Sequence, residues 1–138
     1  MTVDYLRDPK AIYNESFATI RKEADLSNLP EEIADIAVRL IHACGMTDIV
    51  EDIIYSPEVA SSAREALNQG APVLCDARMV VEGIISSRLP ANNEILCWNK
   101  HPECAPLAKK MGTTLSAAAV EFWRTQLSGA VVAVGNAP

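Results

Sequence analysis

The chain has 138 residues, of which 49% are hydrophobic and 22% charged, and its formal net charge is −6. This composition is typical of a globular protein rather than a disordered one, and the excess of acidic residues argues against a broad interface for nucleic acid. No apolar run approaches the roughly 20 residues of a membrane span, and the first residues lack the pattern of a signal peptide. We therefore expect a cytoplasmic protein with no nucleic-acid or membrane partner, whose cysteines are free thiols.

Two helices are predicted before residue 48. Asp8 and Pro9 mark the start of the first helix, because Asp is a favourable N-cap and Pro suits the first helical position. Apolar residues then recur at helical spacing as far as Ala24. The second helix is expected to begin near Pro30 and to end at Gly45, because glycine readily adopts the backbone conformation that terminates helices.

Beyond residue 48, apolar runs typical of strands alternate with segments of helical periodicity. This order predicts an α/β fold, a Rossmann-like three-layer sandwich with a largely parallel sheet, preceded by the two helices. We expect residues 1–138 to form a single domain that is truncated at its C-terminus, because only a short turn follows the last strand. The predicted strands are 52–56, 72–76, 93–98 and 129–134, and the predicted helices are 57–70, 77–86, 102–111 (interrupted by Pro106) and 114–129.

His42 and Arg39 are the first candidates for chemistry, because a spacing of three residues places them on one face of the second helix. Histidine is the side chain whose charge changes most readily near neutral pH, but at the end of an apolar helix it is more often structural than catalytic. Arg39 could orient a substrate carboxylate through its planar guanidinium, or it could form a surface ion pair with Glu32 or Asp35.

Polar residues near the ends of the predicted strands and at a predicted helix start form a second group of candidates. Asp76 lies where a strand becomes a helix, so its carboxylate could point into a site or cap the helix. Thr114 and Ser116 lie at the start of a predicted helix, where hydroxyls and free backbone amides could bind an anionic group or only cap the helix.

Cys97, His101 and Cys104 have a spacing that could begin a zinc site. A closed structural site needs a fourth ligand, and no second Cys/His pair follows, so two unrelated thiols and a loop histidine are the favoured interpretation. We expect no bound metal, although a small zinc-binding module remains an alternative.

Several segments of the sequence together form a pattern that is more specific than a generic α/β fold. The segments, in chain order, are YLRDPKAIYNESFATIRKEADL (5–26), AVRLIHACGM (37–46), YSPEVASSAREAL (55–67), GAPVLCDARMVVEGI (70–84), RLP (88–90), SAAAVEFW (116–123) and GAVVAVGNAP (129–138). Each segment is modest alone, but the ordered set is specific and covers essentially the whole chain. The set resembles the precorrin-8X methylmutases, which are the precorrin isomerases of cobalamin biosynthesis.

The resemblance implies an isomerase that moves a methyl group from C11 to C12 of precorrin-8X to give hydrogenobyrinic acid. The shift is intramolecular, so no cofactor is expected, and the family is an α/β homodimer. A cobalt-precorrin-8 methylmutase or a non-catalytic corrinoid-binding carrier with the same fold are the alternatives. The family motif RM(I/V)HACG stands here at residues 39–45, which makes His42 the implied catalytic acid or base. The expected substrate-binding residues are Ser16 and Arg39, which match family positions, together with Asp76, Thr114 and Ser116.

The chain departs from the family pattern at two positions. Arg78 stands where relatives usually carry an acidic residue, and Leu115 stands where they usually carry arginine. The loss of that arginine removes a plausible partner for a substrate carboxylate. Because the protein itself is acidic, a substrate with many carboxylates has to be held by local donors such as Arg39 and Arg88.

Overall fold

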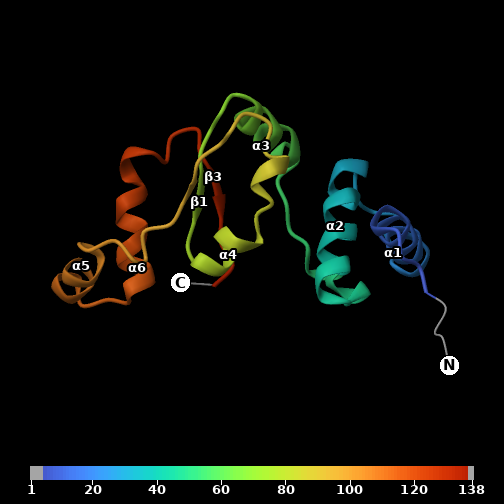
Figure 1. Ribbon diagram of the computed structural model, residues 1–138, viewed down its shortest axis with the longest axis horizontal. Helices are drawn as coiled ribbons and strands as arrows, with labels where there is room; N and C mark the ends of the chain where they lie inside the picture. The colour runs from blue at the N-terminus through green and yellow to red at the C-terminus, as the bar shows by residue number, and fades with distance from the viewer. Residues whose placement is uncertain (1–4, 137–138) are drawn as a thin grey trace. The chain divides into compact units, whose positions relative to one another are not determined.

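The structure is a computed structural model that describes residues 5–136 of the chain. These residues belong to two compact units, which divide between Ala60 and Ser61 and are described here one at a time. Helices and strands are labelled in Figure 1. No helix in the described range is long and apolar enough to cross a membrane.

The N-terminal unit is built on two helices whose ends follow the sequence signals closely. Helix α1 (Pro9–Glu23) is capped by Asp8, whose carboxylate accepts a hydrogen bond from the N–H of Ala11 at 2.8 Å. Helix α2 (Glu31–Cys44) ends at Gly45, which has a φ of 74° and donates its N–H to the carbonyl of Ile41. Both predicted helices are therefore confirmed.

Helices α1 and α2 lie side by side and share a small apolar core (Figure 1). Arg21 of α1 also forms an ion pair with Asp35 of α2 on the exposed side of this contact. The packing fixes which faces of the two helices meet, and hence which residues stand beside His42. The core contains Ile20, Ala24, Val38 and Ile41, with Phe17, Leu26, Ile49 and Val50 packed against it.

The prediction of a strand at residues 52–56 is wrong. A 3₁₀ helix, η1 (Thr47–Asp52), occupies the start of this region, and the following residues are irregular. Ile54 is 96% exposed, and the segment pairs with no strand among the described residues. A run of β-branched residues favours a strand only where a neighbouring strand and a buried face receive it, and neither is present here.

The C-terminal unit contains a three-stranded parallel sheet with the strand order β2-β1-β3. The central strand β1 (Val73–Cys75) is buried at every position, as expected for a parallel strand covered on both faces. Its neighbours are β2 (Ile95–Leu96) and β3 (Val131–Ala133), so that Val73 lies opposite both Ile95 and Val131. The predicted α/β class and the parallel sheet are confirmed, with one strand fewer than expected.

Helical segments precede and connect these strands, and the helices are shorter than predicted. The segment predicted at 114–129 changes from α to 3₁₀ geometry partway along, and Gly129 turns the chain with a φ of 78°. Pro106 does not interrupt its helix, because it lies in the first turn, where backbone N–H groups have no intrahelical partner. The segments are α3 (Val59–Asn68), α4 (Arg78–Gly83), η2 (Ser86–Arg88), α5 (Cys104–Met111), α6 (Leu115–Val120) and η3 (Glu121–Thr125).

Candidate functional site

His42 lies in the last turn of α2, where its exposed side chain meets Ser16 of α1. The Ser16 Oγ and the His42 Nδ1 are 2.8 Å apart and form a hydrogen bond. A hydroxyl can donate or accept, so Ser16 can serve either tautomer of the ring as well as the protonated imidazolium. Because Nδ1 is engaged in this way, Nε2 is the ring nitrogen that a ligand would meet.

Two aromatic rings of α1 surround the same imidazole. The centroid of the Tyr13 ring lies 5.2 Å from that of His42, and the centroid of Phe17 lies 5.4 Å away with the rings nearly perpendicular. Tyr13 and Phe17 also pack edge to face against each other at 5.8 Å. These separations are typical of favourable aromatic contacts, so the imidazole is held on several sides.

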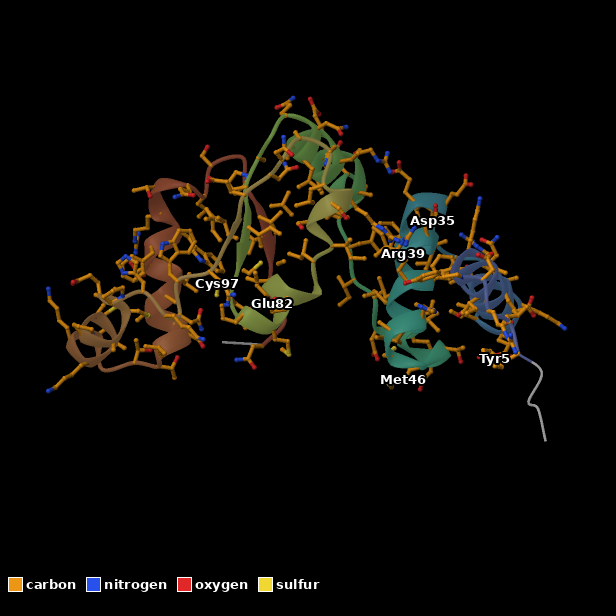
Figure 2. The ribbon with its side chains drawn as sticks, viewed as in Figure 1. Tyr5, Asp35, Arg39, Met46, Glu82 and Cys97 are labelled. Atoms are coloured by element: carbon orange, nitrogen blue, oxygen red, sulfur yellow. The ribbon has the colours of Figure 1, made fainter. Side chains whose placement is uncertain are left out.

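Arg39 lies one turn before His42 on α2 and contacts the same aromatic group. Its guanidinium carbon is 5.4 Å from the centroid of the Phe17 ring, within range of a cation–π contact. The alternative ion-pair partner Asp35 is bound instead by Arg21 of α1. Arg39 and Asp35 can both be located on α2 in Figure 2.

A pocket of ≈ 280 Å³ opens beside the histidine. It is lined by Pro9, Ile12, Tyr13 and His42. The His42 imidazole is therefore a polar, titratable group in a largely apolar wall. This arrangement offers a proton donor or acceptor whose orientation is fixed by Ser16, with a cation one helical turn away. It suits general acid or base chemistry, because such catalysis needs a titratable group in a fixed orientation that a ligand can reach.

Asp76 lies at the carboxyl end of β1 and is only 1% exposed. Its two carboxylate oxygens accept hydrogen bonds from the N–H groups of Gly135 and Asn136, each at 2.9 Å. Helix α4 has Ala77 at its N-cap and no side-chain capping bond. The capping role considered for Asp76 is therefore wrong, because its carboxylate is drawn to the backbone amides that follow β3.

Thr114 and Ser116 both make hydrogen bonds at the start of α6. Thr114 is the N-cap, and its Oγ1 accepts a hydrogen bond from the N–H of Ala117 at 3.1 Å, as the capping interpretation predicts. The Oγ of Ser116 accepts a hydrogen bond from the Nδ2 of Asn99 at 3.3 Å. Leu115 stands between them as a partly exposed apolar side chain.

Cys97, His101 and Cys104 do not converge on a common point. Cys104 is buried at the start of α5, and its Sγ donates to the carbonyl of Leu115 at 3.3 Å. The Nδ1 of His101 accepts from the N–H of Glu103 at 3.3 Å. Within residues 5–136 no group of three or more His, Cys, Asp or Glu side chains is placed to hold a metal ion, so the zinc alternative has no support there.

Burial raises the pKa of two thiols in the C-terminal unit. For Cys75 of β1 the main cause is desolvation, and the nearby Cys97 and Asp76 add to it. For Cys104 the causes are desolvation and Cys97. The neutral thiol is therefore the favoured form at both positions, which does not suit a nucleophile or a metal ligand.

Tyr13 and Phe17 are the members of the His42 site that sequence reasoning did not assign to it. Their spacing was explained by the apolar face of a helix, which is correct for Phe17 because it packs on the core of the N-terminal unit. The available signal is the position of Tyr13, which lies three residues before Ser16 and four before Phe17, since residues three and four apart share a helix face. The sequence alone does not show which residues of α2 this face of α1 contacts.

Comparisons with known proteins agree with this picture. The family model for precorrin-8X methylmutase matches residues 11–138. A precorrin-8X methylmutase from Sinorhizobium is 53% identical over 135 residues, which are 98% of this chain and 64% of that protein. Another from Pseudomonas aeruginosa is 52% identical over 99% of this chain and 65% of its own length.

Solved structures of precorrin-8X methylmutases are also similar to this chain. The precorrin-8X methylmutase of Thermus thermophilus has a TM-score of 0.81 and 32% identity, over 94% of this chain and 63% of that one. A precorrin-8X methylmutase related protein has a TM-score of 0.80 and 30% identity, over 89% and 64% of the two chains. The chain thus spans about 64% of the length of the curated relatives that it matches. On this combined sequence and structural agreement, the chain belongs to the precorrin-8X methylmutase family.

Proposed function

We propose that this chain acts as a precorrin-8X methylmutase, an isomerase that moves a methyl group from C11 to C12 of precorrin-8X and yields hydrogenobyrinic acid in cobalamin biosynthesis. The observation that carries the proposal is the His42 imidazole, held at Nδ1 by Ser16 beside an exposed pocket. Relatives named for cobalt-precorrin-8, such as that of Leptospira interrogans at 26% identity, are more distant than the 53% identical relative named for precorrin-8X. This difference favours the metal-free substrate.

His42 is the proposed catalytic acid or base. A methyl shift around a conjugated macrocycle needs the electron distribution of the ring to be biased, and it needs no covalent nucleophile. A histidine that donates a proton or a hydrogen bond to a ring nitrogen supplies this bias, and the effect is largest when the donor is already oriented. Ser16 provides that orientation, which adds a positioning role to its expected contact with substrate. No methyl donor or redox cofactor enters this scheme.

The substrate's carboxylates are proposed to meet a small number of donors. Arg39 offers a planar guanidinium suited to a carboxylate. Thr114 and Ser116 accept hydrogen bonds through their oxygens, so each hydroxyl proton is left to donate to a ligand. Asp76 is proposed to act indirectly, by holding the loop at residues 135–136 near the carboxyl end of the parallel sheet, where ligands bind in such folds.

The assembly is proposed to be a cytoplasmic homodimer in which residues 1–138 contribute to a single domain. The match of one family model to residues 11–138 supports the single domain, because it includes most of both units. Exposed apolar side chains support a partner surface on α1 and α2, since a monomer gains nothing from leaving them in water. These side chains are Ile12, Tyr13, Ile36 and Leu40.

Single-turnover conversion tests the proposed function, because a tightly held product would obscure steady-state rates. Excess protein is mixed with precorrin-8X, and the absorption spectrum is followed to that of hydrogenobyrinic acid. We expect the wild-type chain to convert the pigment and His42→Ala to bind it without conversion. Pigment that wild-type protein binds but leaves unconverted would instead support the carrier alternative, and near wild-type conversion by His42→Ala would remove the role of His42.

A further inference from the structure

The Phe17 ring makes contacts with both functional side chains of α2. One is the edge-to-face contact with His42 at 5.4 Å, and the other is the Arg39 guanidinium carbon 5.4 Å from the ring centroid. His42 and Arg39 are three residues apart and share a face of α2, so a single ring on α1 reaches both.

The Phe17 ring is itself fixed in place. It is half-buried and packs against the apolar core shared by α1 and α2. Tyr13, one turn earlier on α1, meets it edge to face at 5.8 Å. Because interior side chains have few alternative rotamers, a ring held on these sides keeps its orientation while the exposed groups of α2 rest against it.

The chain contains a matched case in its C-terminal unit. The sequence has two histidines and two phenylalanines, and each histidine packs against one phenylalanine. His101 lies 4.9 Å from Phe122, which is also half-buried and packs on an apolar core. The contacts described for Phe122 include no cationic partner, which is the difference from Phe17.

We propose that Phe17 is a positioning residue that holds Arg39 and His42 in one arrangement, so that the carboxylate-binding cation and the proton donor act together on one ligand. This inference rests on the proposed function and deepens it. An arginine side chain has many rotamers in water, and a ring that restricts them lowers the ordering cost when a carboxylate binds. Orienting the imidazole in the same way favours the transition state, because catalysis is sensitive to displacements of about 1 Å.

Three variants test the proposal. Phe17→Leu keeps an apolar side chain on the core but removes the ring, and Phe17→Tyr keeps the ring. Phe122→Leu is the matched control in the C-terminal unit. Two measurements are made on each variant of the 138-residue chain, and its folding is checked by its urea unfolding midpoint. They are the ring resonances of the two histidines by NMR, and the rate and substrate dependence of single-turnover conversion of precorrin-8X.

In Phe17→Leu we expect the His42 resonances to move, because the aromatic ring current is lost, while those of His101 stay in place. The maximal conversion rate should fall roughly 10- to 100-fold, and the substrate concentration for half-saturation should rise several-fold. Phe17→Tyr should restore both to within about twofold, a rescue that general loss of packing would not give. Phe122→Leu should move only the His101 resonances and leave conversion unchanged.

Unchanged His42 resonances in Phe17→Leu would overturn the proposal, as would equal losses of conversion in Phe17→Leu and Phe122→Leu. Failure of the proposed function is recognised separately, by absence of conversion in the wild-type chain. In that case the resonances still decide whether the Phe17 ring lies against the His42 imidazole. The effect on Arg39 is then measured through binding of precorrin-8X, which changes the absorption of the pigment. We expect Phe17→Leu to bind precorrin-8X more weakly than wild type. Unchanged binding would count against a role of Phe17 in positioning Arg39.

Discussion

Five candidate site residues have different kinds of partner in the two units. In the N-terminal unit Ser16, Arg39 and His42 contact one another or an aromatic ring, and their outer atoms face solvent. In the C-terminal unit the Asp76 carboxylate holds the backbone that follows β3, and Thr114 holds the first turn of α6. A side chain whose partners are other side chains can change its protonation or its ligand without unfolding the local backbone. A side chain that accepts hydrogen bonds from backbone amides is instead part of the local structure.

The two histidines show this difference within one residue type. A backbone N–H can only donate, so the Nδ1 of His101 must carry a lone pair to accept from Glu103. Protonation of that nitrogen would break the bond. The Ser16 hydroxyl at His42 can donate or accept, so the hydrogen bond there survives either state of the ring. The hydrogen bond at His42 therefore persists through a proton transfer at the ring, whereas the bond at His101 would have to break.

The largest expected effect is the difference between His42→Gln and His101→Gln in single-turnover conversion. Glutamine keeps a polar group of similar reach but cannot transfer a proton, so His42→Gln should slow conversion at least 100-fold, within the range of ~10²–10⁴ typical of lost acid–base catalysis. His101→Gln should convert precorrin-8X at the wild-type rate. Comparable losses in the two variants would show that the two histidine environments do not differ in function.

The elements that the sequence predicts well are those with local signals. Asp8 and Pro9 define the start of α1, and Gly45 defines the end of α2, because capping and termination depend on the residues at the ends themselves. The central strand follows from the buried apolar run at residues 72–76. Residues 52–56 contain two adjacent isoleucines that also favour a strand, but no neighbouring strand among the described residues pairs with them, and pairing is not a local property.

The same limit applies to the candidate site. The motif at residues 39–45 identifies His42 and Arg39, and Ser16 follows from the family resemblance. That Phe17 touches both of them depends on how α1 packs against α2, which the periodicity of each helix leaves open. For Asp76 a local sequence pattern led to a wrong prediction. A carboxylate at a strand end suggested a helix cap, yet its partners lie about 60 residues further along the chain, beyond any local rule.

Asp76→Asn should have the largest effect on stability. An amide offers one acceptor oxygen and directs its NH₂ group at a backbone N–H, so one buried hydrogen bond is lost and the remaining one is no longer assisted by charge. We expect the free energy of unfolding in urea to fall by about 2–3 kcal/mol. Ser16→Ala is the matched change in the N-terminal unit and should cost about 0.5 kcal/mol, because its bond to His42 is solvent-accessible. Equal costs in the two variants would contradict the proposed division between the units.

Thr114→Ala tests the same division at a helix end. Removal of the hydroxyl leaves the N–H of Ala117 without its capping acceptor, which should lower the free energy of unfolding by about 1 kcal/mol. Thr114→Ser retains the oxygen and should stay within about 0.3 kcal/mol of wild type. If Thr114 also donates to a substrate carboxylate, Thr114→Ser should bind precorrin-8X as wild type does. A stable but weakly binding Thr114→Ser would separate the two roles.

The smallest expected effect is a loss of stability at high pH that arises in the C-terminal unit. The raised pKa of Cys75 means that the folded state favours the neutral thiol more than the unfolded chain does. Its contribution to stability is therefore fully present below about pH 9 and is lost as the pH rises through the higher folded-state value. Unfolding by urea at pH 8 and pH 10 should show this loss in the wild-type chain.

Cysteine substitutions isolate that contribution from other effects of high pH on stability. Cys75→Ala removes the buried thiol, so its stability should decline less between the two pH values than that of wild type, even though the lost packing lowers it at both. Cys44→Ala in the N-terminal unit removes an exposed thiol and should follow the wild-type decline. The difference between pH values is the informative quantity, because packing losses are common to both measurements and cancel. Parallel declines in Cys75→Ala and Cys44→Ala would show that Cys75 is not the source of the pH sensitivity.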